Sequence, residues 1–238
     1  MVWLVILIVV LAIAIALAYP HMKIPREPDR EGIQDAKAVV AYDRISRWPM
    51  FIIARRLMLN ELKKYQPAGI VLDIGCGPGY LAALLSNKFP HLKVLGLDIS
   101  EEMLRMAKRN FPTIELCQGD VGQLPVKDNT IDFVVSSLSL HHWADARKSI
   151  QEINRILRPG GQFLILDARR DCRRFFYYAL KLDQTLFAPS AIRRTNGEVG
   201  SLWASYTPDE LKTILSETSF CSWRVKAQFG WMFAWGRK

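Results

Sequence analysis

The sequence predicts an α/β fold: a doubly wound, seven-stranded, mostly parallel sheet with a C-terminal antiparallel hairpin, preceded by one N-terminal transmembrane helix. Two observations lead to it. Strand-like and helix-like patterns alternate between residues 70 and 167, which is typical of a parallel sheet covered by helices. Residues 1–19 are all hydrophobic, and without them the hydrophobic content of 50% falls to about 46%, normal for a globular domain. A disordered chain and a polytopic membrane protein are both excluded.

The N-terminal apolar run is long enough to cross a bilayer once. At about 1.5 Å per residue, residues 2–19 span roughly 27 Å as a helix, close to the hydrocarbon thickness of a membrane. Basic residues follow the run but do not precede it, which predicts that the domain lies on the cytoplasmic side. They are Lys23, Arg26, Arg30 and Lys37. A cleaved signal peptide is the alternative, since Ala16-Leu17-Ala18 resembles a cleavage site, although no basic residue precedes the run.

The chain then divides into three parts. Residues 1–22 form the anchor, residues 23–32 form a charged linker that contains prolines, and residues 33–238 form one globular domain. The domain opens with helical sequence up to residue 65. We expect a break in it at Trp48-Pro49, because proline disfavours helical geometry in the residue before it.

Five short apolar segments read as the parallel strands. They are residues 70–74, 94–97, 114–117, 131–136 and 163–167. Helices are predicted at residues 80–86, after Ser100 and at residues 146–157. Ser100 is an expected N-cap, because carboxylates such as Glu101 in the first turn complement the helix dipole. The run Arg158-Pro159-Gly160-Gly161 predicts a turn that leads into the fifth strand.

The last third departs from this alternation. Residues 173–187 read as an apolar and aromatic helix, followed by a loop that contains Asn196-Gly197. Thr207 and Glu210 form a capping-box pair around a proline, which predicts a helix start. Residues 222–228 and 231–235 flank Phe229-Gly230 and read as the two strands of a terminal hairpin.

A glycine-rich motif lies where the first strand passes into a helix. It runs Asp-x-Gly-x-Gly-x-Gly from Asp73 to Gly79. Glycines at such a turn let a ligand approach the backbone, and the helix N-terminus offers free N–H groups to an anion. A dinucleotide fingerprint would need Gly-x-Gly-x-x-Gly, whose last glycine falls at Tyr80. The motif alone leaves open a tight turn without a ligand.

This spacing resembles that of the class I S-adenosylmethionine-dependent methyltransferases. Residues 132–143 (DFVVSSLSLHHW) and 157–161 (LRPGG) resemble the methyltransferase type 11 branch, which contains ubiquinone and menaquinone C-methyltransferases. Tyr42-Asp43 resembles a pair in the N-terminal lid helix of that branch. The resemblance runs from about Tyr42 to the C-terminus. It implies a Rossmann-like methyltransferase fold in which residues 33–66 are lid helices and residues 168–206 are a variable substrate or lid insertion.

The resemblance implies S-adenosyl-L-methionine as cofactor. The glycine loop would face its methionine end, Asp98 would accept hydrogen bonds from the ribose hydroxyls, and Asp120 would accept one from the adenine amino group. The implied cofactor-binding residues are Asp73, Gly75, Cys76, Gly77, Gly79, Asp98, Ile99, Asp120, Val121 and Ser137, with Tyr42 in the lid. Other interpretations stay open: Asp98 would also suit NAD, Asp120 could form an Asx turn, and Ser137 could be a cap.

Methyl transfer can draw much of its rate from orientation, and a general base is needed only when the attacking atom still holds a proton. His141 and His142 follow the fourth strand and are the candidate catalytic residues. A helix-start or packing role is the competing interpretation. No metal is expected, because no third ligand accompanies the histidines. The four cysteines are widely spaced without a CxxC, which indicates reduced thiols.

The net charge of +9 is unevenly distributed. Residues 70–167 carry −1, whereas residues 20–69 carry +4 and residues 168–238 carry +6. The last region has six arginines that we expect on its surface, namely Arg169, Arg170, Arg173, Arg174, Arg193 and Arg194. Beside the aromatic residues 175–178 they predict a membrane-surface element, with a solvated charged face as the alternative.

The sequence therefore predicts a membrane-anchored methyltransferase that acts on a small lipophilic acceptor, a quinone precursor or a lipid. No nucleic-acid partner is expected, because residues 136–139 are Ser-Ser-Leu-Ser where methyltransferases of base amines typically carry Asn/Asp-Pro-Pro-aromatic. Two alternatives remain at this point: an NAD-dependent Rossmann oxidoreductase, and a non-catalytic membrane-tethered module that binds the cofactor.

Overall fold

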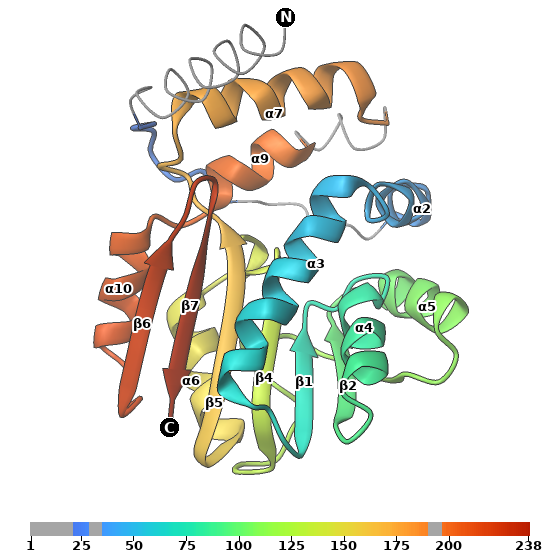
Figure 1. Ribbon diagram of the computed structural model, residues 1–238, viewed down its shortest axis with the longest axis vertical. Coiled ribbons are helices and arrows are strands. Elements are labelled where there is room, and N and C mark those ends of the chain that lie inside the picture. Colours follow the sequence, from blue (N-terminus) through green and yellow to red (C-terminus); the bar gives the residue numbers. More distant parts are fainter. Residues whose placement is uncertain (1–20, 29–34, 190–196) are drawn as a thin grey trace, which may run out of the picture.

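The computed structural model describes residues 21–28, 35–189 and 197–238 of the chain. They form a three-layer α/β unit in which helices cover both faces of a seven-stranded sheet (Figure 1). The strand order is β3-β2-β1-β4-β5-β7-β6. The strands are β1 (Ile70–Ile74), β2 (Lys93–Asp98), β3 (Glu115–Gln118), β4 (Ile131–Ser137), β5 (Leu157–Ala168), β6 (Ser222–Ala227) and β7 (Trp231–Arg237).

The predicted fold class is confirmed in its α/β part. Strands β1 to β5 are parallel, and β7 runs antiparallel to both β5 and β6, so β6 and β7 are the expected hairpin. From β1 the chain winds outward to β2 and β3 and then returns to place β4 on the other side of β1. The carboxyl ends of β1 and β4 therefore form a switch point, the usual ligand position in such sheets.

Strand β5 begins earlier than the sequence predicts. It includes Arg158 to Gly161, where we expect a turn. Ile131 pairs with Leu157 while Phe133 pairs with Gln162, so the register between β4 and β5 shifts there. The additional residues on β5 form an irregularity within the strand, where Gly160 has a φ of 81°.

Ten helical segments complete the described part of the chain. The α-helices are α2 (Ala36–Ile45), α3 (Pro49–Leu62), α4 (Tyr80–Lys88), α5 (Glu101–Asn110), α6 (Ala146–Ile156), α7 (Arg174–Phe187), α9 (Gly197–Ala204) and α10 (Pro208–Ser216), and the 3-10 turns are η1 (Lys63–Tyr65) and η2 (Leu140–His142). The expected break at Trp48-Pro49 separates α2 from α3. Ser100 caps α5 by accepting from the Met103 amide, and the Thr207/Glu210 capping box begins α10.

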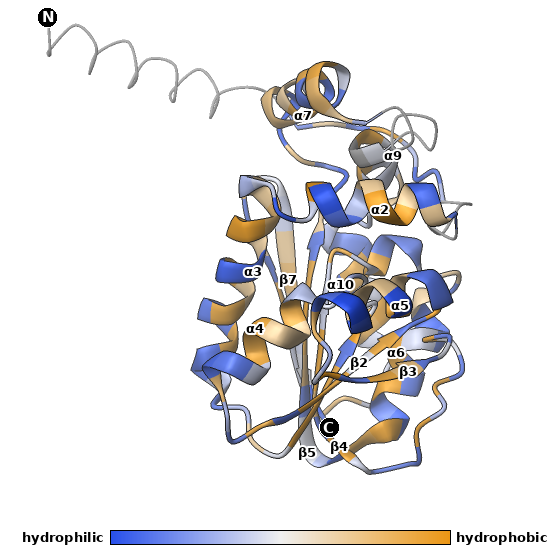
Figure 2. Ribbon diagram, turned by 90° about the vertical axis from the view of Figure 1, so that its right-hand side faces the viewer, coloured by the Kyte–Doolittle hydropathy of each residue, from blue (hydrophilic) through white to orange (hydrophobic). Residues whose placement is uncertain are grey.

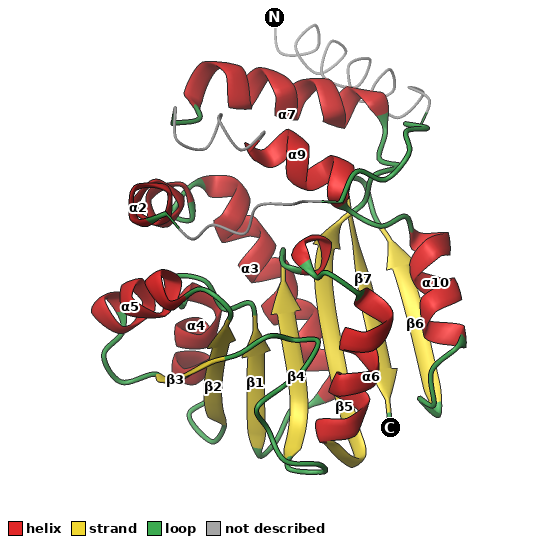
Figure 3. Ribbon diagram, turned by 180° about the vertical axis from the view of Figure 1, so that it is seen from behind, coloured by secondary structure: helices red, strands yellow, loops and turns green. Residues whose placement is uncertain are grey.

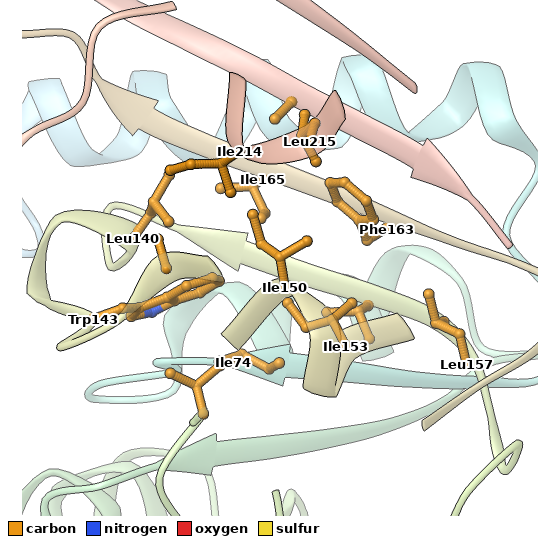
Figure 4. Close-up of a cluster of buried hydrophobic side chains, with 14 of the residues drawn as sticks. Ile74, Leu140, Trp143, Ile150, Ile153, Leu157, Phe163, Ile165, Ile214 and Leu215 are labelled. Carbon is orange, nitrogen blue, oxygen red and sulfur yellow. The ribbon is translucent and has the colours of Figure 1, made fainter. Parts of the chain in front are cut away.

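Two hydrophobic cores lie on opposite faces of the sheet, because successive strand side chains alternate between faces. On β5, Phe163 and Ile165 belong to the core beneath α6 and α10, whereas Leu164 and Leu166 belong to the core beneath α3 and α4. Figure 4 shows the first core, with Phe163 and Ile165 near Ile150 of α6. Figure 3 shows α6 and α10 together on that face.

Helices α7 and α9 lie beyond the carboxyl ends of the strands rather than on a face of the sheet (Figures 1 and 3). The sequence predicts a loop around Asn196-Gly197, but α9 begins at Gly197. Two glycines in eight residues give α9 little intrinsic helix propensity. Packing stabilises it instead: Val199 and Leu202 are buried, and the Val199 amide donates to Gln184 of α7 (2.9 Å).

No helix in residues 21–28, 35–189 and 197–238 is long and apolar enough to cross a membrane. The predicted anchor, residues 1–19, lies outside these described ranges.

Candidate functional site

A narrow cleft of about 50 Å³ lies at the carboxyl end of β1, between the glycine loop and helices α2 and α3. Six predicted site residues line it, namely Tyr42, Asp73, Gly75, Cys76, Gly77 and Ser137. Gly75 and Gly77 have φ values of 69° and 51°, a conformation that glycine adopts most readily. A Cβ built on Gly77 would find its nearest neighbour, Tyr42, 3.8 Å away. The backbone is thus open to a ligand at this point.

Asp98, at the end of β2, is held in place by backbone donors. Its Oδ2 accepts from the Gly77 amide (2.8 Å) and its Oδ1 accepts from the Ser100 amide (2.9 Å). Burial raises the pKa of Asp98, and these two hydrogen bonds oppose that shift. A carboxylate has about four acceptor positions, so Asp98 can still accept from a bound diol.

Asp73 is buried, and within the described part of the chain its Oδ2 has no hydrogen-bond partner. Burial, and then the nearby charge of Asp98, raise the pKa of Asp73 well above 3.8. Two buried carboxylates so close together favour a cationic ligand, because a positive charge would relieve their repulsion. The orphaned oxygen of Asp73 therefore fits a ligand with an ammonium or sulfonium group.

Arg55 of α3 also lines the narrow cleft, and the sequence analysis missed it. Its Nη2 donates to the Ser46 carbonyl (2.8 Å), and burial lowers the pKa of its guanidinium. A guanidinium suits a carboxylate partner. The cleft therefore offers both signs of charge, as a zwitterionic ligand such as the methionine end of the expected cofactor requires.

Five predicted residues, Asp98 among them, are not part of the cleft lining. Gly79 caps α4 in a left-handed conformation, with φ 85°. Ile99 is 57% exposed beside Asp98. Asp120 is exposed and accepts from the Gly122 amide (2.8 Å), which is the Asx turn that we left open, and Val121 packs beneath it in the core. The assignment of all the predicted residues to cofactor binding stays a prediction.

Helix α2 is hydrogen-bonded through Asp43 to the start of α4 and the end of α5. Tyr80 donates to Asp43 Oδ1 (3.0 Å), and Asn110 of α5 donates to the same oxygen (2.7 Å). Arg47 donates to both Asp43 Oδ2 (2.7 Å) and the Tyr80 hydroxyl (2.6 Å). Tyr80 stands where a dinucleotide-binding fingerprint has its third glycine. The side chain that replaces this glycine hydrogen-bonds Asp43 of α2.

A larger apolar cavity of about 380 Å³ adjoins the narrow cleft. Five parts of the chain enclose it: α2 with the first half of α3, the segment after β4, the end of β5, α7 with α9, and the β6–β7 hairpin. Its apolar lining includes Met50, Ile53, Leu57, Leu166, Phe176, Leu180 and Trp231. An apolar molecule of moderate size suits such a site.

His141 supplies a polar group at the wall of this cavity. It is 3% exposed, and its Nδ1 lies 2.7 Å from Asp167 Oδ1. Asp167 Oδ2 also accepts from the His141 amide (2.8 Å). A carboxylate on Nδ1 favours the tautomer with its proton on that nitrogen, which leaves Nε2 as the basic nitrogen. His142 lines the same cavity, with its ring centroid 4.0 Å from that of His141.

Sequence reasoning identified the two histidines but not Asp167. The available signal was the position of Asp167 at the carboxyl end of the predicted fifth strand, the edge where the other site residues gather. The predicted alternatives, a helix start or a packing role, describe His141 incompletely, because its ring is both hydrogen-bonded and part of the cavity wall.

The narrow cleft and the apolar cavity meet at shared residues. Tyr42, Phe51, Ala54 and Leu138 line both. Leu138 has a φ of 56°, an unusual value for a residue with a branched side chain, and such strained residues concentrate at functional sites. The arrangement suits the transfer of a group from a ligand in the cleft to a ligand in the cavity.

Comparison with known sequences agrees with this geometry. Residues 72–165 match the family described as a methyltransferase domain. A demethylmenaquinone methyltransferase of Symbiobacterium thermophilum is 33% identical over 132 residues, which are 52% of this chain and 53% of that protein. The ubiquinone/menaquinone biosynthesis C-methyltransferase UbiE of Desulfotalea psychrophila is 33% identical over 142 residues, 58% of this chain and 54% of that protein. The chain spans about half the length of these relatives.

Solved structures share the fold over most of the chain. A SAM-dependent methyltransferase from Aquifex aeolicus has a TM-score of 0.59 at 20% identity, covering 85% of this chain and 98% of that one. The plantazolicin methyltransferase BpumL, in complex with a triazolic desmethylPZN analog and SAH, has a TM-score of 0.65 at 16% identity, covering 85% and 90%. At these identities the likeness shows the fold.

Proposed function

Because the chain belongs to the class I S-adenosylmethionine-dependent methyltransferases, we propose that it methylates a small lipophilic acceptor, a quinone precursor or a lipid, held in the apolar cavity. The observation that carries this proposal is the meeting of two unlike cavities. The narrow cleft has the buried carboxylate of Asp73 for a cationic cofactor, and the adjoining cavity of about 380 Å³ has an apolar lining with His141, the partner of Asp167, at its wall.

Residues in and beside the narrow cleft would bind different parts of the cofactor. Asp98 would hold the ribose, Asp73 and Arg55 would bind the ammonium and carboxylate of the methionine end, and Tyr42 would cover it from the lid. When bound, S-adenosylmethionine supplies an electrophilic methyl group on a sulfonium centre. Much of the rate then comes from orientation of the acceptor toward that methyl group.

His141 gives the site a base for an acceptor whose nucleophilic atom still carries a proton. Its Nε2 would take that proton as the new bond to the methyl group forms, and Asp167 would stabilise the imidazolium. The apolar wall would keep water from competing as acceptor. A hydroxylated quinone precursor fits these demands, and the demethylmenaquinone methyltransferase relatives point to the same class.

The two alternative functions are less well supported. The family match favours methyl transfer over an NAD-dependent oxidoreductase, in agreement with Tyr80 at the third fingerprint position. A non-catalytic module would not need the buried His141–Asp167 pair (2.7 Å) at the wall of a cavity.

The proposed location is a membrane, with residues 1–19 as a single-pass anchor and the domain on the cytoplasmic side. The support comes from the sequence: the length of the apolar run and the basic residues that follow it. Alkaline extraction of membranes would test the anchor, and release of the protein into the soluble fraction would contradict it.

The function is tested by incubating the full chain with methyl-labelled S-adenosylmethionine and a total membrane lipid extract. We expect label in the lipid fraction. The same incubation with protein and RNA as acceptors serves as the control. Label in protein or RNA with a blank lipid fraction would overturn the lipophilic acceptor, and absence of label from every fraction would contradict catalysis of this class.

A further inference from the structure

Helix α7 is apolar on two sides, yet none of its fourteen residues is fully buried. One side carries Phe176 and Leu180, which line the apolar cavity. The other side carries Phe175, Tyr178, Leu182 and Leu186, which are 46%, 58%, 59% and 62% exposed. Their spacing of three or four residues places them in one stripe, which we call the α7 outer face. An exposed stripe of large apolar side chains is typical of a contact surface.

We propose that the α7 outer face rests in the interfacial layer of a lipid bilayer that contains anionic lipids. Figure 2 shows that α7 carries both hydrophobic and hydrophilic residues and lies at the end of the molecule opposite the C-terminus. Aromatic side chains such as Phe175 and Tyr178 favour the headgroup region of a membrane. The exposed charges on α7 are Arg174 and Lys181, both cationic, while Asp183 is only half exposed.

The path of the chain supports a membrane as the occupant. The described N-terminal segment starts at His21, which forms a β-bridge with Arg173 at the beginning of α7, and the Met22 amide donates to the Cys172 carbonyl (2.8 Å). The chain that follows the apolar residues 1–19 is therefore fixed at the start of α7. Lys23, which follows them, is exposed. A segment long enough to cross a bilayer would bring its surface to α7.

Fewer arginines are available for lipid contact than the sequence predicts. Arg169 pairs with Asp171 (2.7 Å), and Arg170 is 5% exposed and pairs with Glu210 (2.6 Å). These two arginines hold the segment before α7 in place and do not face lipid, because their charges are already paired. Arg193 and Arg194 lie outside the described residues. The surface cations that remain for lipid contact include Lys23, Arg174 and Lys181.

Docking of α7 would also open a route for the acceptor. Phe176 and Leu180 line the apolar cavity from the side of α7 that is turned away from its outer face. The partly exposed side chains of Met50 and Ile53 also lie at the cavity wall. An acceptor dissolved in the bilayer could reach the cavity without crossing water. This route rests on the proposed function, whereas the docking surface itself does not.

The test uses the full chain in phosphatidylcholine vesicles with and without phosphatidylglycerol, and it needs no turnover. A fluorophore is attached to Leu182→Cys in a background with Cys117→Ser and Cys221→Ser, and quenching by doxyl-labelled lipid is measured. Cys76 and Cys172 are buried, and burial raises the pKa of both thiols, that of Cys172 to about 11, so both stay unlabelled. Native Cys221, which is the exposed cysteine that remains in the Cys117→Ser chain, is the control. It lies just before β6 and next to Arg237 of β7, which pairs with Gln162 near the start of β5, at the end of the sheet opposite α7.

We expect several-fold stronger lipid quenching at position 182 than at Cys221. Equal quenching would overturn the proposal. A shielded label at position 182 that lipid does not quench would also overturn it, because residues 1–19 of the same chain or a second copy would then cover the helix. Titration with S-adenosylhomocysteine checks the fold of each chain, so failure of docking is distinguishable from failure of the proposed function.

The charge contribution is tested with Arg174→Gln and Lys181→Gln together. Each cation near an anionic surface contributes about 1 kcal/mol, or roughly a 5-fold change in partition, so the pair should lose most of the difference between the two vesicle types. Lys88→Gln with Lys127→Gln is the control, since both lysines are exposed on segments that lead into the amino ends of strands. An equal loss in the control pair would contradict a specific contact of α7 with lipid.

Discussion

The narrow cleft and the apolar cavity share four residues, yet they are built by different means. The cleft is formed around one strand-to-helix turn and its neighbours, and directed hydrogen bonds fix it, such as those from the Gly77 and Ser100 amides to Asp98. The cavity is enclosed by five segments that are far apart in the sequence, and most of its wall is apolar. A shared chemistry can thus stay constant in the cleft while the cavity changes with the acceptor.

The largest expected effect removes a basic side chain at the wall of the apolar cavity. His141→Ala should lower the rate of methyl transfer by about 10² to 10⁴-fold, the usual contribution of a general base, while affinity for S-adenosylhomocysteine stays unchanged. The rate of label transfer into lipid at saturating cofactor measures the first, and calorimetric titration measures the second. His91→Ala, on the exposed loop before β2, is the matched control.

An unchanged rate in His141→Ala would show that the acceptor brings no proton that needs a base. Asp167→Asn sharpens the interpretation, because it removes the charge that favours the Nδ1 tautomer. A loss of rate in that variant that is smaller than in His141→Ala, at constant cofactor affinity, is the expected result of a positioning role.

The difference between the regions also explains what the sequence could predict. The glycine loop, Asp98 and the ends of the strands are local features, so the pattern Asp-x-Gly-x-Gly-x-Gly was enough to locate the cleft. Gln184 and Val199 hold α7 to α9 through a contact between segments that the sequence could not bring together (2.9 Å). Asp167 was missed for the same reason, since its partner lies 26 residues away. Long-range packing decided the cavity, and no local pattern encodes it.

The second effect is confined to the cleft. Asp98→Ala should weaken S-adenosylhomocysteine binding by about 2 to 4 kcal/mol, or roughly 30 to 1,000-fold, because a ligand loses charge-assisted hydrogen bonds and the Gly77 amide loses its acceptor. Asp209→Ala, at a side chain that is 91% exposed, serves as control in the same titration. Unchanged affinity in Asp98→Ala would remove this residue from the site.

The third effect is confined to the cavity. A Cβ on Gly230 would lie 2.5 to 2.7 Å from three ring atoms of Phe176, so Gly230→Ala must displace that ring. Overpacking of this kind typically costs about 1 to 3 kcal/mol, and we expect it as a raised KM for the acceptor with unchanged S-adenosylhomocysteine affinity. Adding Phe176→Leu should restore room and part of the affinity. A KM that stays at the wild-type value in Gly230→Ala would separate this wall from the acceptor.

The smallest expected effect concerns Asp73, whose burial should lower the stability of the ligand-free protein at neutral pH. The pKa of Asp73 is higher in the folded chain than its ordinary 3.8, so the folded form keeps this proton after the unfolded form has lost it. The contribution of Asp73 to stability is therefore lost as pH rises from about 3.8 through the folded pKa. Asp73→Asn should flatten that part of the pH dependence and stabilise the free protein at neutral pH by on the order of 1 kcal/mol. It should also weaken S-adenosylmethionine binding, because the cationic cofactor loses a carboxylate partner.

Thermal unfolding over a pH series measures the change in stability, and calorimetry measures the change in binding. Asp209→Asn serves as control in both. If Asp73→Asn were less stable than wild type at neutral pH, or bound the cofactor as tightly as wild type, the unpartnered oxygen of Asp73 would not be a cofactor-binding group.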